Sequence, residues 1–301
     1  MMINQIGASA GYTFAYWALD SSLDRFLWSI ERLSELGYRQ FSLEILEAPH
    51  AAIYGPENTK RLLNKGKEKG VSFSSFIPYH CVTNLSSAEK ERRKLGVKQF
   101  GEGVEIAKRL GISLVTIASD WPPEWVSSYS GAYAHAPAEE FRVPSREAYD
   151  RIWCDHLGAL ASCLEIAEKN QVRMGYEPRA NSLVANVDGF LRAWDELGSR
   201  NFVCVLDVMH SAYHREDMPV AIKKLGDRLG IVQVCGSDGG VLQHVPLLDD
   251  PPSRNMMKAL DEINFKGILD VELYGMPSDE VDKAYREARE ILERHIAAVN
   301  S

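Results

Sequence analysis

Several features that mark other classes of protein are missing from this 301-residue sequence. The five cysteines are odd in number and show no CxxC spacing, which fits a reducing compartment better than a disulfide framework. No apolar run approaches the length of about 18 residues that spans a bilayer. Residues 1–11 also lack the basic and apolar regions of a signal peptide. We therefore expect a cytoplasmic protein with no membrane segment.

Long basic runs are scarce as well. Asp and Glu outnumber Lys and Arg by 42 to 34, and the formal net charge is −8. The densest basic stretch, 90–94, is interrupted by Glu91. Nucleic-acid binding relies on basic patches that neutralise phosphates. The charge therefore disfavours a nucleic-acid partner, including the DNA-binding function of an endonuclease.

Glycine-rich phosphate loops are absent, because no GxxxxGK[ST] motif occurs and no glycine fingerprint follows the first apolar run. What is present is an alternation of short apolar runs with stretches of 3.6-residue apolar periodicity. The expected strands are 5–9, 41–45, 72–78, 114–119, 173–177, 202–207, 231–234 and 267–272. The expected helices are 23–36, 57–69, 100–110, 155–168, 187–197, 220–229, 256–263 and 281–296.

Eight strand–helix units in one chain predict a parallel sheet closed into a single (β/α)8 TIM barrel. We expect one domain, 1–301, since no linker or composition change divides the chain. The fourth connection is unusually long: residues 120–145 are rich in Pro, Trp, Tyr and Ala. Connections of this length are usually lids or partner surfaces.

The carboxyl ends of four consecutive strands carry polar side chains. Residues 173–177 end in Glu177, 202–207 end in Asp207, 231–234 contain Gln233, and 267–272 end in Glu272. These ends meet at the face of a TIM barrel where active sites lie. Glu44 is a weaker candidate for the same rim.

A divalent cation is the simplest way to neutralise these acids. Buried carboxylates are costly unless they are paired, and no Lys or Arg ends these four strands. Three carboxylates and one amide oxygen are hard ligands, which favours Mn²⁺, with Mg²⁺ or Co²⁺ as alternatives. We therefore predict that Glu177, Asp207, Gln233 and Glu272 bind one metal ion.

Histidines add candidates around this rim. His210 follows Asp207 by three residues, His80 follows the third strand, and His244 follows the seventh. We expect His80 and His244 to contact substrate. His156 and His295 fall on predicted helices and are expected on the outer surface.

Other rim residues are expected to bind substrate. Trp121, in the long fourth connection, could stack on a sugar face, and His135 lies in the same connection. Arg179, just past Glu177, would bind a substrate carboxylate or phosphate, or else form a surface ion pair.

The chain resembles the xylose isomerase-like TIM-barrel superfamily, in its sugar isomerase and epimerase branch. The stretches that carry the resemblance, in order, are LGYRQFSLEI, FIPYHCVTNLSS, RRKLGVKQFGEGVEIAKRLGISLVTI, MGYEPRANSLVAN, VLDVMH, VQVCGSD and INFKGILDVELYG. Each stretch is weak alone, but the order and spacing are fairly specific for the superfamily. The resemblance implies that Glu177 and Glu272 form an acid/base pair and that His210 contacts a substrate oxygen.

Two departures bear on the reaction. Gln233 stands where most relatives have His, as in hydroxypyruvate isomerases, and residues 236–240 lack the substrate-binding Arg of the epimerases. We expect a sugar isomerase or epimerase that removes a proton next to a carbonyl and forms a cis-enediolate. The alternative is a lyase that eliminates the aglycone of a 3-keto glycoside, with His135 acting on the leaving group. The expected assembly is a homo-oligomer, with a small partner subunit in the lyase case.

Overall fold

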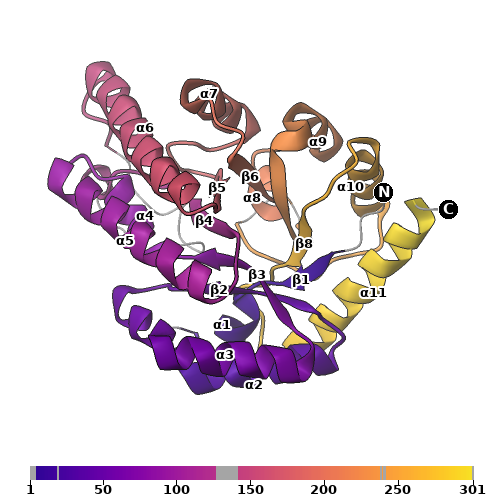
Figure 1. The fold of residues 1–301 in the computed structure, drawn as a ribbon. Helices are drawn as coiled ribbons and strands as arrows, with labels where there is room; N and C mark the ends of the chain where they lie inside the picture. The colour runs from indigo at the N-terminus through magenta and orange to yellow at the C-terminus, as the bar shows by residue number, and fades with distance from the viewer. Residues whose placement is uncertain (1–4, 19, 127–141, 238, 240–241, 300–301) are drawn as a thin grey trace.

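Eight parallel strands pair in chain order and close into a barrel, as predicted (Figure 1). This computed structural model describes residues 5–18, 20–126, 142–237, 239 and 242–299. The barrel closes where Ile6 of β1 pairs with Leu269 of β8. The strands are β1 Ile6–Ala8, β2 Gln40–Glu44, β3 Ser72–Ile77, β4 Leu114–Ala118, β5 Arg173–Glu177, β6 Phe202–Asp207, β7 Leu229–Val234 and β8 Ile268–Val271.

Helices surround the barrel and connect its strands (Figure 1). The longer ones are α2 Leu23–Glu35, α3 Pro56–Lys69, α5 Lys90–Arg109, α6 Arg146–Lys169, α7 Val187–Leu197, α9 Met218–Leu225, α10 Pro251–Glu262 and α11 Val281–Val299. Three shorter helices are α1 Gly11–Trp17, α4 Val82–Leu85 and α8 Val208–Tyr213. Short 3₁₀ turns are η1 Ala48–Tyr54, η2 Tyr79–Cys81, η3 Pro123–Trp125 and η5 Gly226–Arg228.

The strands form because parallel barrel strands are buried on both faces and therefore read as apolar runs. Every residue of β6 and β7 is buried. The side chains of Leu114, Val203, Val205 and Ile231 form a separate apolar cluster. Because alternate residues of a strand share a face, Val205 and Asp207 point the same way, as do Ile231 and Gln233. The polar rim residues therefore sit one step beyond this apolar cluster.

Local signals in the sequence fix the helix ends. Ser22 caps α2 by accepting the backbone N–H of Arg25, and Asn186 caps α7 by accepting that of Gly189. Helix α7 ends at Leu197 and is followed by Gly198, whose φ of 64° is left-handed and suits glycine. Both α2 and α7 bury one apolar stripe against the strands, as their periodicity predicts.

Two histidines contradict the prediction that they lie on the outer surface. His156 of α6 is 1% exposed, and its Nε2 lies 2.8 Å from the hydroxyl of Tyr176. His295 of α11 is 6% exposed, and its Nε2 lies 3.0 Å from Oδ1 of Asp249. Both occupy the inward stripe of a helix, where each has a polar partner that its own helix does not provide.

Part of the long fourth connection is described. Trp121 and η3 follow β4, and residues 127–141, including His135, lie outside the described residues. Within the described residues, no helix has both the length and the apolar character that a membrane crossing requires.

Candidate active site at the carboxyl end of the barrel

Strand register brings together four of the predicted side chains. Asp207 of β6 pairs with Gln233 of β7, and Gln233 pairs with Asp270 of β8. Glu272 lies next to the same strand, because its backbone N–H donates to the carbonyl of Val234 at 3.0 Å. Glu177 ends β5, the strand next to β6. Asp207, Gln233, Glu177 and Glu272 are all buried.

Three of these four residues offer an oxygen atom that accepts no hydrogen bond in the described part of the chain. Within the described residues, Glu177 Oε1, Gln233 Oε1 and Glu272 Oε2 are buried and accept no hydrogen bond. Burial raises the pKa of Glu272 well above its usual range, and the charges of Asp207 and Glu177 raise it further. The cluster is buried and acidic, and it contains carboxylate and amide oxygens that accept no hydrogen bond. Such oxygens are the ligands that hard divalent cations prefer.

Asp207 is held at both of its oxygens. Its Oδ1 caps α8 by accepting the backbone N–H of Met209 at 2.6 Å and that of His210 at 3.4 Å. Its Oδ2 lies 3.2 Å from Nε2 of His244. Burial acts to raise the pKa of Asp207, but the imidazoles of His210 and His244 and these hydrogen bonds outweigh burial and lower it.

His210 directs one nitrogen at Glu177. The backbone N–H of Ala180 donates to His210 Nδ1 at 3.3 Å, so Nδ1 carries no proton and the proton of the neutral ring is on Nε2. That Nε2 lies 3.4 Å from Glu177 Oε1. His210 therefore presents an N–H donor to the cluster, and a protonated nitrogen cannot bind a metal ion.

A second group of polar residues comes from the end of β2, from η2 after β3 and from the segment after β5. Glu44 ends β2, is 4% exposed, and accepts the hydroxyl of Tyr274 at 2.5 Å. Burial raises the pKa of Glu44 to about 8, with Glu177 adding to the rise and Tyr274 opposing it. Arg179 is buried and donates to the hydroxyl of Tyr79 at 2.5 Å. Arg179 is thus an inward-facing cation and not part of an exposed ion pair.

The remaining predicted residues lie at different distances from the cluster. Half-buried His80 is the middle residue of η2, the turn after β3, and burial lowers its pKa. Trp121 packs near Trp125, with ring centroids 6.3 Å apart. His244 contacts Asp207 directly. The structure therefore brings His244 to the cluster and places His80 in η2, which packs against α5.

Three further residues of this region were not predicted. Tyr274 bonds Glu44, Tyr79 bonds Arg179, and Asp270 lies buried one step below Glu272. Burial raises the pKa of Asp270 to about 7. Asp270 had a signal in the sequence, since it lies two residues before Glu272 in the predicted strand 267–272 and alternate residues of a strand share a face.

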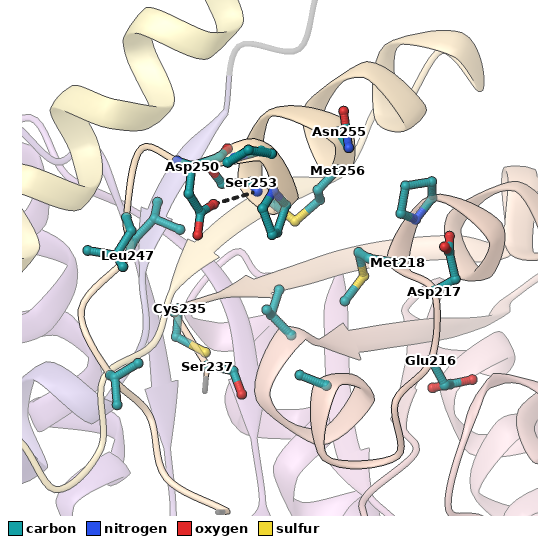
Figure 2. A pocket seen from close by; sticks show the side chains of 18 residues that line it. Glu216, Asp217, Met218, Cys235, Ser237, Leu247, Asp250, Ser253, Asn255 and Met256 are labelled. Atoms are coloured by element: carbon teal, nitrogen blue, oxygen red, sulfur yellow. Dashed lines mark hydrogen bonds between the residues drawn. The ribbon is translucent and has the colours of Figure 1, made fainter. Parts of the chain in front are cut away.

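A cavity of about 670 Å³ lies beside the site but does not include it. Figure 2 shows Met218, Cys235, Leu247 and Met256 around it, and none of the four clustered residues lines it. Val208 and Ala212 of α8 face this cavity, whereas His210 lies on the opposite side of that helix. This cavity and the polar cluster are therefore separate spaces.

Comparisons with known proteins agree with this architecture. Residues 30–295 match the model of a family described as xylose isomerase-like TIM barrel. A D-psicose 3-epimerase of Enterocloster bolteae is 24% identical over 95% of this chain and 89% of its own length. A fructoselysine 3-epimerase of Escherichia coli O157:H7 is 25% identical over 64% of this chain and 68% of its own length.

Solved structures show the same fold. A D-tagatose 3-epimerase-like protein superimposes with a TM-score of 0.76 at 19% identity, covering 99% of this chain and 98% of its own. The IolI protein with a bound zinc atom gives a TM-score of 0.73 at 14% identity, covering 98% and 99%. A 3-keto-D-glucoside 4-epimerase from E. coli gives 0.68 at 15% identity, covering 96% and 100%.

Proposed function

Because this chain belongs to the xylose isomerase-like TIM-barrel family, we propose that it is a metal-dependent sugar isomerase or epimerase. The observation that carries the proposal is the buried oxygen cluster of Glu177, Asp207, Gln233 and Glu272. The 3-epimerases among its relatives support the same class of substrate. The partner is then a sugar or sugar derivative with a carbonyl group.

The four clustered residues would hold one divalent cation, Mn²⁺ before Mg²⁺ or Co²⁺, because their donors are hard oxygens. When bound, the cation supplies a Lewis acid that polarises a substrate carbonyl. Glu177 and Glu272 come from β5 and the end of β8, so they approach the barrel axis from different sides. One carboxylate removes the proton on the carbon next to the carbonyl. The other returns a proton to the opposite face or to the neighbouring carbon.

Other side chains bind and orient the sugar in this proposal. His210 donates its Nε2–H to a substrate oxygen, since its Nδ1 already accepts the N–H of Ala180. Arg179 is buried and lies two residues past Glu177 in the sequence. Its guanidinium group supports recognition of an oxygen-rich or anionic substituent on the sugar. It would supply the positive charge that residues 236–240 lack.

The lyase alternative depends on residues 120–145. Its acid/base residue, His135, lies outside the described residues, and the neighbour that acts on a 3-keto-D-glucoside is similar in fold. Elimination would start from the same proton abstraction. The partner subunit, the homo-oligomer and the single domain 1–301 also stay predictions.

Solvent exchange in D₂O tests the proposal. The purified protein with Mn²⁺ is incubated with ketoses, α-hydroxy-aldehydes and 3-keto glycosides, and deuterium incorporation is followed by NMR. We expect exchange into an isomer or epimer. Glu272→Gln should slow it by about 10²–10⁴-fold, the usual contribution of a general acid or base. Glu262→Gln, which alters an exposed ion pair with Lys223, is the matched control and should leave exchange unchanged.

The outcomes separate the candidate reactions. Exchange accompanied by loss of an aglycone would replace the isomerase assignment with the lyase. A wild-type protein that neither binds Mn²⁺ nor exchanges any substrate would contradict both reactions.

A further inference from the structure

His244 has a hydrogen-bonding partner at each ring nitrogen. The backbone N–H of Tyr274 lies 3.2 Å from His244 Nδ1, and Asp207 Oδ2 lies 3.2 Å from His244 Nε2. His244 is 2% exposed and Asp207 is 2% exposed, so bulk water does not compete for these contacts. The three residues come from the loop after β7, the segment after β8 and the end of β6.

These contacts fix where the proton of the ring resides. A backbone N–H can only donate, so His244 Nδ1 must accept and carries no hydrogen. The neutral ring then has its hydrogen on Nε2, which points at a carboxylate oxygen that can only accept. The direction of both hydrogen bonds therefore follows from the single donor at Tyr274.

We infer that His244 is a positioning residue that orients the Asp207 carboxylate by donating its Nε2–H to Oδ2, in a tautomer set by the Tyr274 backbone. The inference deepens the proposed function and rests on it for the role of Asp207. The N-terminus of α8 holds Oδ1 and His244 holds Oδ2, so the carboxylate is fixed in its plane. Partners of this kind commonly orient metal-binding carboxylates.

The same tautomer removes His244 from the set of metal ligands, while the substrate contact predicted for it stays a prediction. Asp207, Cys235 and His244 place ligand atoms within 4.8 Å of one another and could have formed a softer metal site. An Nε2 that carries a proton cannot ligate, and burial raises the pKa of the Cys235 thiol well above its usual range. His244 therefore affects the oxygen cluster only through its hydrogen bond to Asp207.

The network also joins two sides of the barrel mouth. Tyr274 donates its backbone N–H to His244 and its hydroxyl to Glu44 Oε2. Asp207 at the end of β6 and Glu44 at the end of β2 are thus connected through His244 and Tyr274. Replacing His244 should disturb Asp207 first, because that contact is direct.

The tautomer can be observed without metal or substrate. In protein labelled with ¹⁵N-histidine, a long-range ¹H–¹⁵N correlation spectrum distinguishes protonated from unprotonated ring nitrogens, and loss of a signal in His244→Gln assigns the residue. We expect the hydrogen on Nε2. A hydrogen on Nδ1 in place of Nε2 would overturn the inference whether or not the protein is an epimerase.

Mn²⁺ affinity measured by calorimetry tests the positioning role. His244→Phe keeps the ring volume but removes the donor, and we expect Mn²⁺ to bind about 10–100-fold more weakly. His244→Gln keeps an N–H near the position of Nε2 and should restore most of the affinity. His295→Phe removes a remote buried histidine that also contacts an aspartate, and it should leave affinity unchanged.

These measurements distinguish failure of the positioning role of His244 from failure of the proposed function. His244→Phe that binds Mn²⁺ like wild type, or His244→Gln that is as weak as His244→Phe, would overturn the positioning role. If wild type binds no Mn²⁺, the proposed function fails, and the tautomer spectrum alone decides whether His244 donates to Asp207. Thermal unfolding of each variant confirms that it is folded under the conditions used.

Discussion

Two buried hydrogen bonds determine the tautomer of the His156 imidazole. Its Nδ1 lies 3.2 Å from the carbonyl of Leu85, which can only accept, so Nδ1 carries the hydrogen. Its Nε2 then accepts the hydroxyl of Tyr176. Burial lowers the pKa of His156 to about 4 in the folded protein. A neutral, doubly bonded imidazole therefore connects α6 to α4 and to β5.

This depressed pKa predicts acid sensitivity. Between about pH 6.5 and pH 4 the unfolded chain binds a proton at this position and the folded protein does not. The free energy of unfolding should therefore fall as pH decreases through this window, by up to about 3 kcal/mol from this group. Guanidinium unfolding at pH 7, 5.5 and 4.5 measures it, and His156→Gln should show a flatter profile. Parallel profiles for the two proteins would contradict the assignment.

At the level of elements, α5 shows how one glycine sets the approach of two helices. A Cβ added at Gly96 would lie 2.7 Å from the backbone nitrogen of Leu85 in α4. A Cβ added at Gly101, on the same helix, would meet only the side chain of Ile166, with Cδ1 at 3.7 Å and Cγ2 at 3.8 Å, which are ordinary contacts. Backbone cannot yield as a flexible side chain can, so the two positions should respond oppositely to the same substitution.

Alanine at each position provides the comparison. Gly96→Ala should lower the free energy of unfolding by about 1–3 kcal/mol through overpacking against α4. Gly101→Ala should raise it by up to about 1 kcal/mol, because alanine is the better helix former. Denaturant midpoints of the two variants measure the difference. Similar stabilisation at both positions would show that α4 can move away from α5 at little cost.

For the whole molecule, the mouth of the barrel concentrates buried acidic side chains. Glu177, Asp207 and Glu272 come from strands far apart in the chain, and closure of the barrel forces them together. Their repulsion opposes folding, and a bound divalent cation would reverse it. The stability of the barrel should therefore depend on metal.

Thermal unfolding with and without Mn²⁺ tests this dependence. At a free Mn²⁺ concentration 100 times Kd, the expected stabilisation is about 2.7 kcal/mol, or roughly 5 °C in Tm for a chain of this size. Glu272→Gln should unfold at a higher temperature than wild type in EDTA, since it removes a buried acid whose ionisation is opposed by burial and by the charges of Asp207 and Glu177. It should gain less from Mn²⁺, because it weakens the site. NaCl at matched ionic strength is the control, and an equal gain from NaCl would contradict specific binding.

Much of this organisation could be predicted from local pattern. The bounds predicted for β5, β6 and α7 match those observed, because strands buried on both faces and a single apolar stripe are local signals. Helices α5 and α6 begin ten and nine residues before their predicted starts at 100 and 155. Their first turns are more polar, so an apolar stripe marks only the rest of each helix. The short helices α1, α4 and α8 were missed, since tertiary contacts stabilise helices of this length.

The sequence by itself determined the alternation of strands and helices, the closed barrel, and the residues at the carboxyl ends of β5 to β8. Periodicity and strand ends are properties of neighbouring residues, so the chain alone reveals them. Only the tertiary structure decided that His156 is buried, that Tyr274 reaches Glu44, and that His244 bonds Asp207. Each of these contacts joins residues at least 20 positions apart. Such pairs form only when the barrel closes, and no local pattern encodes them.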